Sequence, residues 1–189
     1  MKTIIISFAI LFAVSTNLFS QENSLLKAGD NVPMFQTVTD DGSTWKIKEY
    51  LGKKNIIIYF YPAAMTGGCT KQACAYRDFK DDIELADAVV VGVSGDNVEG
   101  LKIFKKTYDL NFTLLSDESG KIAKKFGVIS RDGGTITVEV EGKEVDLYRG
   151  NTAGRTTFII GKNGKIIYAN DKVDAKKDVK DALEFLRKN

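Results

Sequence analysis

The sequence predicts an α/β fold with a sheet that is at least partly parallel. Two apolar runs, at 56–61 and 88–94, have the composition of strands that are buried on both faces. The segment between them, at 69–87, favours a helix. Because strands and helices alternate along the chain, we expect helices to pack against a central sheet.

The bulk composition indicates one domain of ordinary size. The chain of 189 residues carries 27 basic and 25 acidic residues, which gives a net charge of +2. This balance gives no electrostatic reason to expect a strongly acidic partner, so we expect no nucleic acid partner. The sequence has no internal repeat and no interdomain linker. We therefore place a single domain at 27–189.

Residues 1–20 resemble a secretory signal peptide. Lys2 precedes an apolar stretch at 4–14, which is shorter than the roughly 20 residues that a membrane span needs. We expect residues 21–26 to form a short tail. The protein would then be exported to the bacterial periplasm or the extracellular space, with no stable membrane association after the signal is removed. A helix packed on the domain and an uncleaved anchor remain the alternatives for 1–20.

Periodicity and turn residues predict the other elements. An N-terminal hairpin is expected around Asp40-Asp41-Gly42, with strands at 35–39 and 44–47. A second hairpin at 133–148 turns at Glu141-Gly142. The remaining strands are predicted at 112–115, 155–160 and 165–168, the last two joined through Asn163-Gly164. The remaining helices are predicted at 98–108, 119–126 and 174–188.

Several residues receive structural assignments. We place four large aromatic residues in the core: Trp45, Tyr59, Phe60 and Phe158. The polar cluster at 116–119 is interpreted as a helix cap and not as a metal site. We expect three polar residues of the first helix to lie on its exposed or pocket-rim side: Lys71, Gln72 and Arg77.

Both cysteines lie in one stretch, directly after the first apolar run. Cys69 falls in the first turn of the predicted helix, where unpaired N–H groups and the helix dipole favour a thiolate. Gly67 and Gly68 let the backbone approach a small ligand, and Thr66 offers a hydroxyl. The chain has no histidine, which excludes Cys-His dyads and most zinc sites. We assign no cofactor and no metal.

The spacing of Cys69 and Cys74 argues against a permanent disulfide. In a helix, residues five apart have Cα atoms roughly 8 to 9 Å apart, whereas a disulfide needs about 4.4 to 6.8 Å. The two sulfurs can therefore bond only if the intervening helix unwinds. This favours a bond that is made and broken in a reaction, with a structural disulfide in an exported protein as the alternative.

The pattern Pro62-x-x-x-Thr66-x-x-Cys69, followed by Cys74 and later by Arg155-Thr-Thr-Phe, resembles the peroxiredoxin signature of the alkyl hydroperoxide reductase/thiol-specific antioxidant family. The Phe-Tyr-Pro start and the five-residue cysteine offset resemble the bacterioferritin-comigratory-protein, or PrxQ-like, subfamily. The likeness runs from about residue 27 to the C-terminus.

This resemblance implies a thioredoxin-like fold, with a central mixed β-sheet flanked by helices. It implies a thiol-dependent peroxidase that reduces hydrogen peroxide and organic hydroperoxides. Cys69 would be the peroxidatic cysteine and Cys74 the resolving one, while Thr66 and Arg155 orient and polarise the peroxide and Pro62 shields the pocket. The implied partner is a thioredoxin-like dithiol reductant, and the implied state is a monomer or a weak dimer.

The chain departs from the family pattern at a few positions. Gly67 stands where proline is usual, Gln72 where glutamate is frequent, and Ala63-Ala64 where a polar pair often follows the proline. The hairpin at 133–148 is also longer than the plain pattern. One alternative activity is that of an exported thiol-disulfide oxidoreductase of the thioredoxin or TlpA type, but four residues separate the cysteines here instead of two. A non-enzymatic domain with a structural disulfide is the alternative from another class.

Overall fold

The structure is a computed structural model that describes residues 24–189. The predicted signal peptide at 1–20 and the first part of the predicted tail lie outside the described residues. Leu25 and Leu26 pack against the core, and the Leu26 N–H donates to the Phe126 carbonyl at 3.0 Å. The end of the predicted tail therefore packs against the domain.

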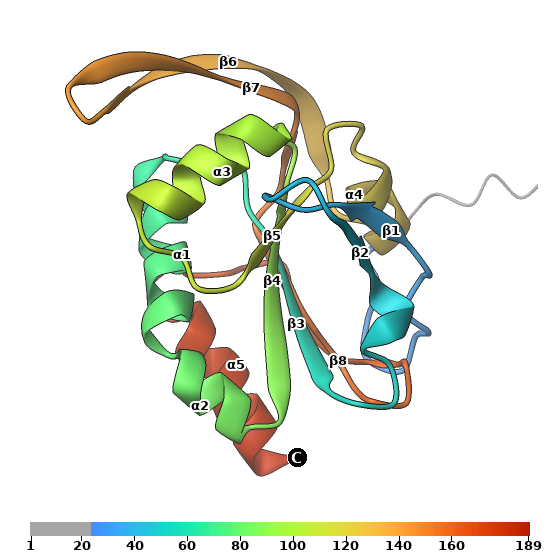
Figure 1. Ribbon diagram of the computed structural model, residues 1–189. Coiled ribbons are helices and arrows are strands. Elements are labelled where there is room, and N and C mark those ends of the chain that lie inside the picture. Colours follow the sequence, from blue (N-terminus) through green and yellow to red (C-terminus); the bar gives the residue numbers. More distant parts are fainter. Residues whose placement is uncertain (1–23) are drawn as a thin grey trace, which may run out of the picture.

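A five-stranded mixed sheet with the order β5-β4-β3-β8-β9 forms the centre of the protein (Figure 1). Its strands are β3 (Asn55–Phe60), β4 (Ala88–Ser94), β5 (Thr113–Ser116), β8 (Thr156–Ile160) and β9 (Ile166–Asn170). β3 pairs in parallel with β4, and β4 with β5, whereas β8 is antiparallel to both β3 and β9. The two apolar runs are thus the adjacent central strands, and the predicted α/β class with a mixed sheet is confirmed.

Helices cover one face of the sheet, and a mixed layer covers the other (Figure 1). Side chains of β3 alternate between the two faces: Tyr59 joins the helical side, while Ile58 and Phe60 join the opposite side. The helical side holds α1 (Gly67–Asp78), α2 (Lys80–Leu85), α3 (Val98–Thr107) and α5 (Asp178–Lys188). The other side holds α4 (Lys121–Phe126) and the hairpin of β1 (Gln36–Val38) and β2 (Thr44–Lys46), which continues into a short 3-10 helix (Ile47–Glu49). The aromatic core predicted at 45, 59, 60 and 158 is confirmed, since these side chains are at most 4% exposed.

The single helix predicted at 69–87 is wrong, because the chain forms two helices there. Helix α1 ends at Phe79, whose φ and ψ of −99° and 18° depart from helical values, and α2 begins directly afterwards. No glycine or proline marks the break, and Phe79 itself packs against the core. Tertiary packing, and not local propensity, therefore ends α1.

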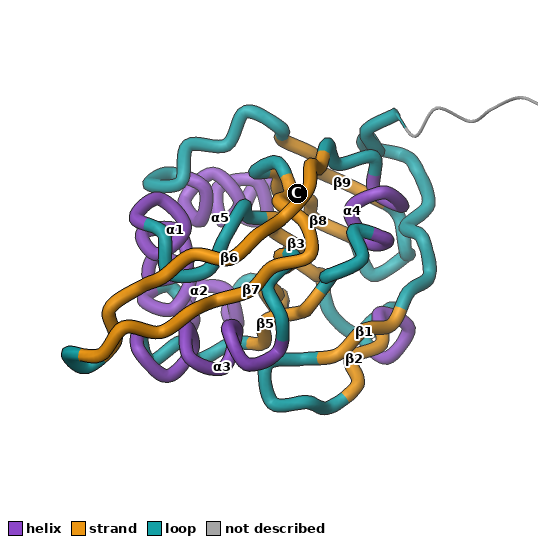
Figure 2. Tube along the Cα trace, turned by 90° about the horizontal axis from the view of Figure 1, so that it is seen from above, coloured by secondary structure: helices purple, strands orange, loops and turns teal. Residues whose placement is uncertain are grey.

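A long two-stranded arm precedes the strand β8. It comprises β6 (Ser130–Val140) and β7 (Lys143–Ala153), which pair antiparallel and turn at Glu141-Gly142, as predicted. The arm is longer at both ends than the predicted hairpin and projects over α3 (Figures 1 and 2). An ion pair of 3.8 Å between Lys106 and Glu141 joins the tip to the end of α3.

The remaining elements lie close to their predicted places. The β8–β9 hairpin turns at Gly164, which has a φ of 75°. The Asp117 carboxylate accepts the N–H groups of Ile122 and Ala123 at 3.0 and 2.8 Å, so the polar cluster at 116–119 does cap α4. Helix α5 begins at Asp178, four residues later than predicted. No helix within 24–189 is long and apolar enough to span a membrane.

Candidate active site

The site lies where the central strand β3 leads through a short loop into the N-terminus of α1. Met65, in this loop, has a φ of 63°, an uncommon left-handed conformation for a residue other than glycine. Thr66 is the N-cap of α1, yet its hydroxyl donates to the Ala63 carbonyl at 2.9 Å and accepts no helix N–H. The Thr66 side chain therefore does not cap the first-turn N–H groups of α1, and these groups remain available to a ligand.

Cys69 lies in the first turn of α1, as predicted, and is 2% exposed. Nη2 of Arg155 lies 3.3 Å from its Sγ and donates to it. The same guanidinium rests on Gly68, where an added Cβ would be 3.4 Å from Nη2. A cation and the positive end of a helix thus meet at one sulfur, an arrangement that favours negative charge there.

Arg155 reaches the site because β8 lies beside β3. Thr156, the first residue of β8, is paired with Phe60, the last residue of β3. Arg155 therefore emerges at the same edge of the sheet as the loop that leads to Cys69. The structure brings the predicted pair together although they are 86 positions apart in the sequence.

The prediction that Gln72 lies on the exposed or pocket-rim side of α1 is wrong. Its side chain is fully buried, one turn after Cys69, and its Oε1 accepts a hydrogen bond from Nη1 of Arg155. Its Nε2 donates to Oδ2 of Asp178 at 2.6 Å. Lys71 is exposed as predicted, and Arg77 is half-buried, with Nη1 donating to the Tyr108 carbonyl at 2.6 Å.

Cys74 lies in α1 and is partly exposed. Both cysteines are free thiols, and the backbone between them is helical. Helix geometry keeps the Cα atoms of such a pair beyond disulfide reach, so the two sulfurs meet only if α1 opens.

The loop before α1 is tied to the end of β4. Asp96 is fully buried, and its Oδ2 accepts the Ala64 N–H at 2.8 Å and the Ser94 hydroxyl at 2.7 Å. Burial raises the pKa of Asp96, while these donors act in the opposite direction. Pro62, on the same loop, is half-buried and lines a depression of about 250 Å³ together with Ile129, Ala153 and Gly154.

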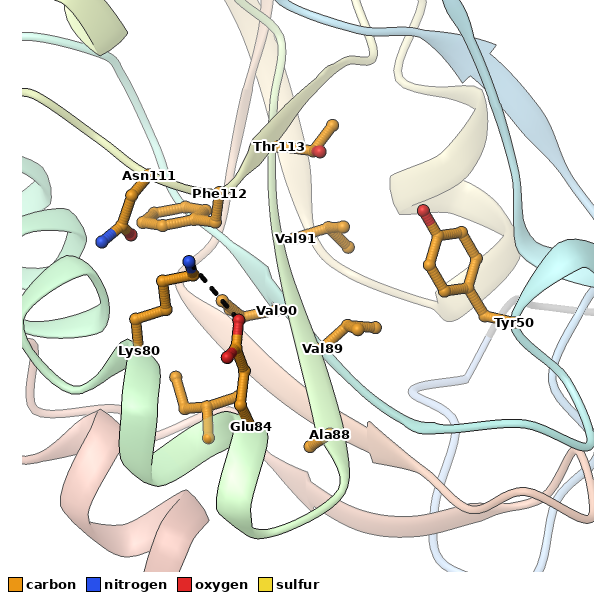
Figure 3. Close-up of a pocket in the computed structure, with 11 residues that line it drawn as sticks. Tyr50, Lys80, Glu84, Ala88, Val89, Val90, Val91, Asn111, Phe112 and Thr113 are labelled. Carbon is orange, nitrogen blue, oxygen red and sulfur yellow. Dashed lines mark ion pairs between the residues drawn. The ribbon is translucent and has the colours of Figure 1, made fainter.

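Another pocket lies away from this site, at the edge of the sheet (Figure 3). Strand β5 pairs with β4 only from Val91 onward, which leaves the beginning of β4 without a neighbour on that side. A cavity of about 180 Å³ opens there, between Tyr50 on one side of β4 and the Lys80–Glu84 ion pair of 3.4 Å on the other. None of the predicted site residues lines it.

Sequence reasoning missed two contacts: Gln72 accepts a hydrogen bond from Arg155, and Asp178 in turn accepts one from Gln72. Gln72 is three residues after Cys69, a spacing that puts both side chains on one face of a helix and would have indicated contact. Asp178 lies four residues before the core residue Ala182, so it shares the apolar face of α5. A charged residue on such a face is the signal that could have identified it. Within 24–189, no group of three or more Cys, Asp or Glu side chains is arranged to hold a metal.

Comparison with known proteins places the chain in a family. The model of the AhpC/TSA family matches residues 28–169. The chain is 37% identical over 177 residues to the chloroplastic peroxiredoxin Q of Populus jackii, covering 93% of this chain and 73% of the relative. It is also 37% identical over 151 residues to a putative peroxiredoxin bcp of Coxiella burnetii, covering 79% and 92%.

A solved structure shows the same fold. The crystal structure of peroxidoxin BcpB from Mycobacterium tuberculosis matches with a TM-score of 0.72 and 30% identity, covering 86% of this chain and 97% of that one. The thioredoxin-like fold expected from the sequence is confirmed by this likeness. The chain therefore belongs to the AhpC/TSA family and is a peroxiredoxin, a thiol-dependent peroxidase.

Proposed function

We propose that the protein reduces hydrogen peroxide and organic hydroperoxides through a sulfenic acid on Cys69 and a disulfide between Cys69 and Cys74. The observation that carries the proposal is the contact of 3.3 Å between the Arg155 guanidinium and the Cys69 sulfur at the start of α1. A thiolate that is stabilised by both groups is the nucleophile that this chemistry needs.

In the first step, the Cys69 thiolate attacks one oxygen of the peroxide. An S–O bond forms, the O–O bond breaks, and the leaving oxygen takes a proton to give water or an alcohol. Charge develops on that leaving oxygen, and the Arg155 guanidinium and the uncapped N–H groups of α1 are placed to stabilise it. The Thr66 hydroxyl, whose hydrogen is engaged by Ala63, accepts a hydrogen bond from the peroxide.

In the second step, α1 unwinds and Cys74 attacks the sulfenic sulfur. The S–S bond forms, the S–O bond breaks, and water leaves. A thioredoxin-like dithiol partner then reduces the disulfide by thiol–disulfide exchange, which oxidises the partner and restores both thiols. The partial exposure of Cys74 and the helical separation of the two thiols support this order of events.

The surroundings of Pro62 support acceptance of organic hydroperoxides. Ile129 is 87% exposed beside Pro62 and Ala153, so an apolar surface borders the site. An organic substituent would bury part of this surface. We expect Ile129→Ser to raise the KM for cumene hydroperoxide several-fold and to leave that for hydrogen peroxide within twofold. An equal change for both substrates would contradict this role.

The test of the function is peroxide consumption with dithiothreitol or a thioredoxin system. Cys69→Ser should abolish activity, and full activity in this variant would refute the proposal. Cys74→Ser should accumulate a sulfenic acid that dimedone labels on Cys69, and it should over-oxidise more readily. A Cys74→Ser variant that showed neither a trappable sulfenic acid nor greater over-oxidation would refute the resolving role.

The cellular setting is part of the proposal. The leader-like segment 1–20 supports export to the periplasm or the extracellular space, and the subfamily resemblance supports a monomer or a weak dimer. Cell fractionation with N-terminal sequencing of the mature chain, and sedimentation equilibrium of the reduced protein, test these two points.

A further inference from the structure

Asp178, the first residue of α5, places a carboxylate in the core. Its side chain is 1% exposed, and no lysine or arginine within 24–189 forms an ion pair with it. Its Oδ2 instead accepts three hydrogen bonds from neutral groups. Burial raises the pKa of this carboxyl, and the three donors lower it. Because a buried carboxylate without a cation is costly, packing alone does not account for an aspartate here.

The three donors come from α1, which carries Cys69, and from β8, which directly follows Arg155. Gln72 Nε2 at 2.6 Å and the Tyr76 hydroxyl at 2.7 Å belong to α1, which also carries Cys69. The Thr157 hydroxyl at 2.9 Å belongs to β8, two residues after Arg155. One oxygen of α5 therefore holds α1 and β8 together beneath the active site.

The chemistry of the partners fixes the orientation of the Gln72 amide. A carboxylate only accepts hydrogen bonds and a guanidinium only donates them. Gln72 must therefore turn its NH₂ toward Asp178 and its oxygen toward Arg155, as the structure has it. With the opposite orientation, the amide NH₂ would face the guanidinium, donor against donor. The hydrogen bond between Gln72 and Asp178 thus sets which group of Gln72 faces the Arg155 guanidinium at the Cys69 sulfur.

We propose that Asp178 is a positioning residue of the peroxidase. Through Gln72 it orients Arg155 at Cys69, and through Gln72 and Tyr76 it holds α1 helical. This inference rests on the proposed function, in which Arg155 acts in the first step and α1 opens for the second. Asp178 therefore accelerates the reaction with peroxide and slows disulfide formation.

The two effects can be measured separately. Oxidation of Cys69 by hydrogen peroxide is followed by stopped flow in a Cys74→Ser background, where no disulfide with Cys74 forms. Opening of α1 is followed by hydrogen exchange in the reduced protein, and disulfide formation by single-turnover quenching with both cysteines present. Asp181→Asn is the matched control, because Asp181 is an exposed aspartate in the same first turn of α5.

Asp178→Asn keeps one acceptor oxygen but removes its charge, and it should slow Cys69 oxidation by about tenfold, the difference between a charge-assisted and a neutral hydrogen bond. It should accelerate hydrogen exchange in α1 and disulfide formation by at least threefold, while Asp181→Asn changes each quantity by less than twofold. Effects of the same sign on both chemical steps, or no effect on either, would overturn the inference. If Asp178→Asn does not fold, Asp178→Ser takes its place, because serine keeps a hydrogen-bond acceptor in a smaller side chain. We expect the same changes in this variant.

A double-mutant cycle separates positioning from general support of the fold. In a Gln72→Met background the link from Asp178 to Arg155 is already broken, so Asp178→Asn should change Cys69 oxidation by less than twofold. If Asp178→Asn still slowed Cys69 oxidation tenfold in that background, the Asp178 carboxylate would have only a structural role.

The outcomes also distinguish this inference from the proposed function. If the wild type formed no disulfide between Cys69 and Cys74, the proposed function would fail, while exchange in α1 and oxidation in the Cys74→Ser background would still decide the role of Asp178. Conversely, Asp178→Asn could show wild-type turnover together with the wild-type rates of hydrogen exchange in α1 and of Cys69 oxidation. That result would reject the inference and leave the proposed function intact.

Discussion

Arg149 on β7 lies against Asp96 at the end of β4, with Nε 3.4 Å from Oδ1 in an ion pair whose side chains are 9% and 0% exposed. Asp96 also accepts the Ala64 N–H of the loop that leads to Cys69. The base of the β6–β7 arm is therefore connected, through one carboxylate, to the active-site loop. The arm supports the site as well as extending the surface.

Removal of Arg149 should destabilise the protein strongly. Arg149→Met leaves the buried carboxylate of Asp96 without its cation, and we expect a loss of about 3 to 5 kcal/mol in the free energy of unfolding. Urea unfolding followed by Trp45 fluorescence measures it. Arg131→Met, at an exposed position on β6, is the control and should change stability by less than about 0.5 kcal/mol. A loss below 1 kcal/mol for Arg149→Met would contradict the prediction.

Replacement of Arg155 by lysine should impair the first chemical step. Lysine keeps the charge but loses the planar fork that contacts Cys69 with one nitrogen and Gln72 with the other. We expect the second-order rate constant of Cys69 oxidation to fall by roughly 100- to 1,000-fold, the effect of losing one preorganised donor. Stopped-flow measurements on Arg155→Lys test this, with Arg131→Lys as the control. A rate within twofold of the wild type would remove Arg155 from the mechanism.

Gly67→Pro should stabilise α1. Gly67 is the first helical residue, an added Cβ there meets nothing within 4 Å, and Thr66 before it is extended at φ −90° and ψ 146°. We expect a gain of about 0.4 to 1 kcal/mol in the free energy of unfolding, and slower disulfide formation between Cys69 and Cys74. Gly42→Pro is the contrasting variant. Gly42 has a φ of 83°, which proline cannot adopt, so this substitution should destabilise the protein. Faster disulfide formation in Gly67→Pro would contradict the expectation.

Asp87 should contribute to stability in a defined pH range. Lys162 and then Lys54 lower its pKa from 3.8 to about 2. A lowered folded-state pKa means that the contribution is present above the unfolded value of about 3.9 and is lost as the pH falls toward 2. The stability difference between wild type and Asp87→Asn should therefore be constant from pH 5 to 7, fall steeply between pH 4 and 2, and lose the rest of its pH-dependent part below pH 2. Urea midpoints at these pH values measure it, and Asp171→Asn, at an exposed residue, should show a smaller change with pH.

Local sequence was sufficient for the elements that local forces determine. The apolar runs of β3 and β4, the Asn163-Gly164 turn and the helical position of Cys69 follow from periodicity and turn chemistry alone. The break at Phe79 did not follow, because the sequence around it favours helix and only packing against the core ends α1.

The candidate site was predictable only in part for the same reason. The motif indicated Cys69, Thr66 and Arg155, and the structure brings Cys69 and Arg155 into contact. The pairing of Gln72 with Asp178, 106 positions later, depends on how α5 docks against α1, which no local pattern encodes.

The break at Phe79 also limits how much structure the protein would lose if Cys74 moves as proposed. Unwinding that begins at Gly67 reaches its natural end after the twelve residues of α1, because α2 is a separate helix with its own buried contact at Ile83. We expect residues beyond the break, and the sheet that follows them, to keep their hydrogen bonds. In the proposed mechanism each turnover would therefore open a small cooperative unit, and the cost of exposing it would be set by one helix and not by the domain.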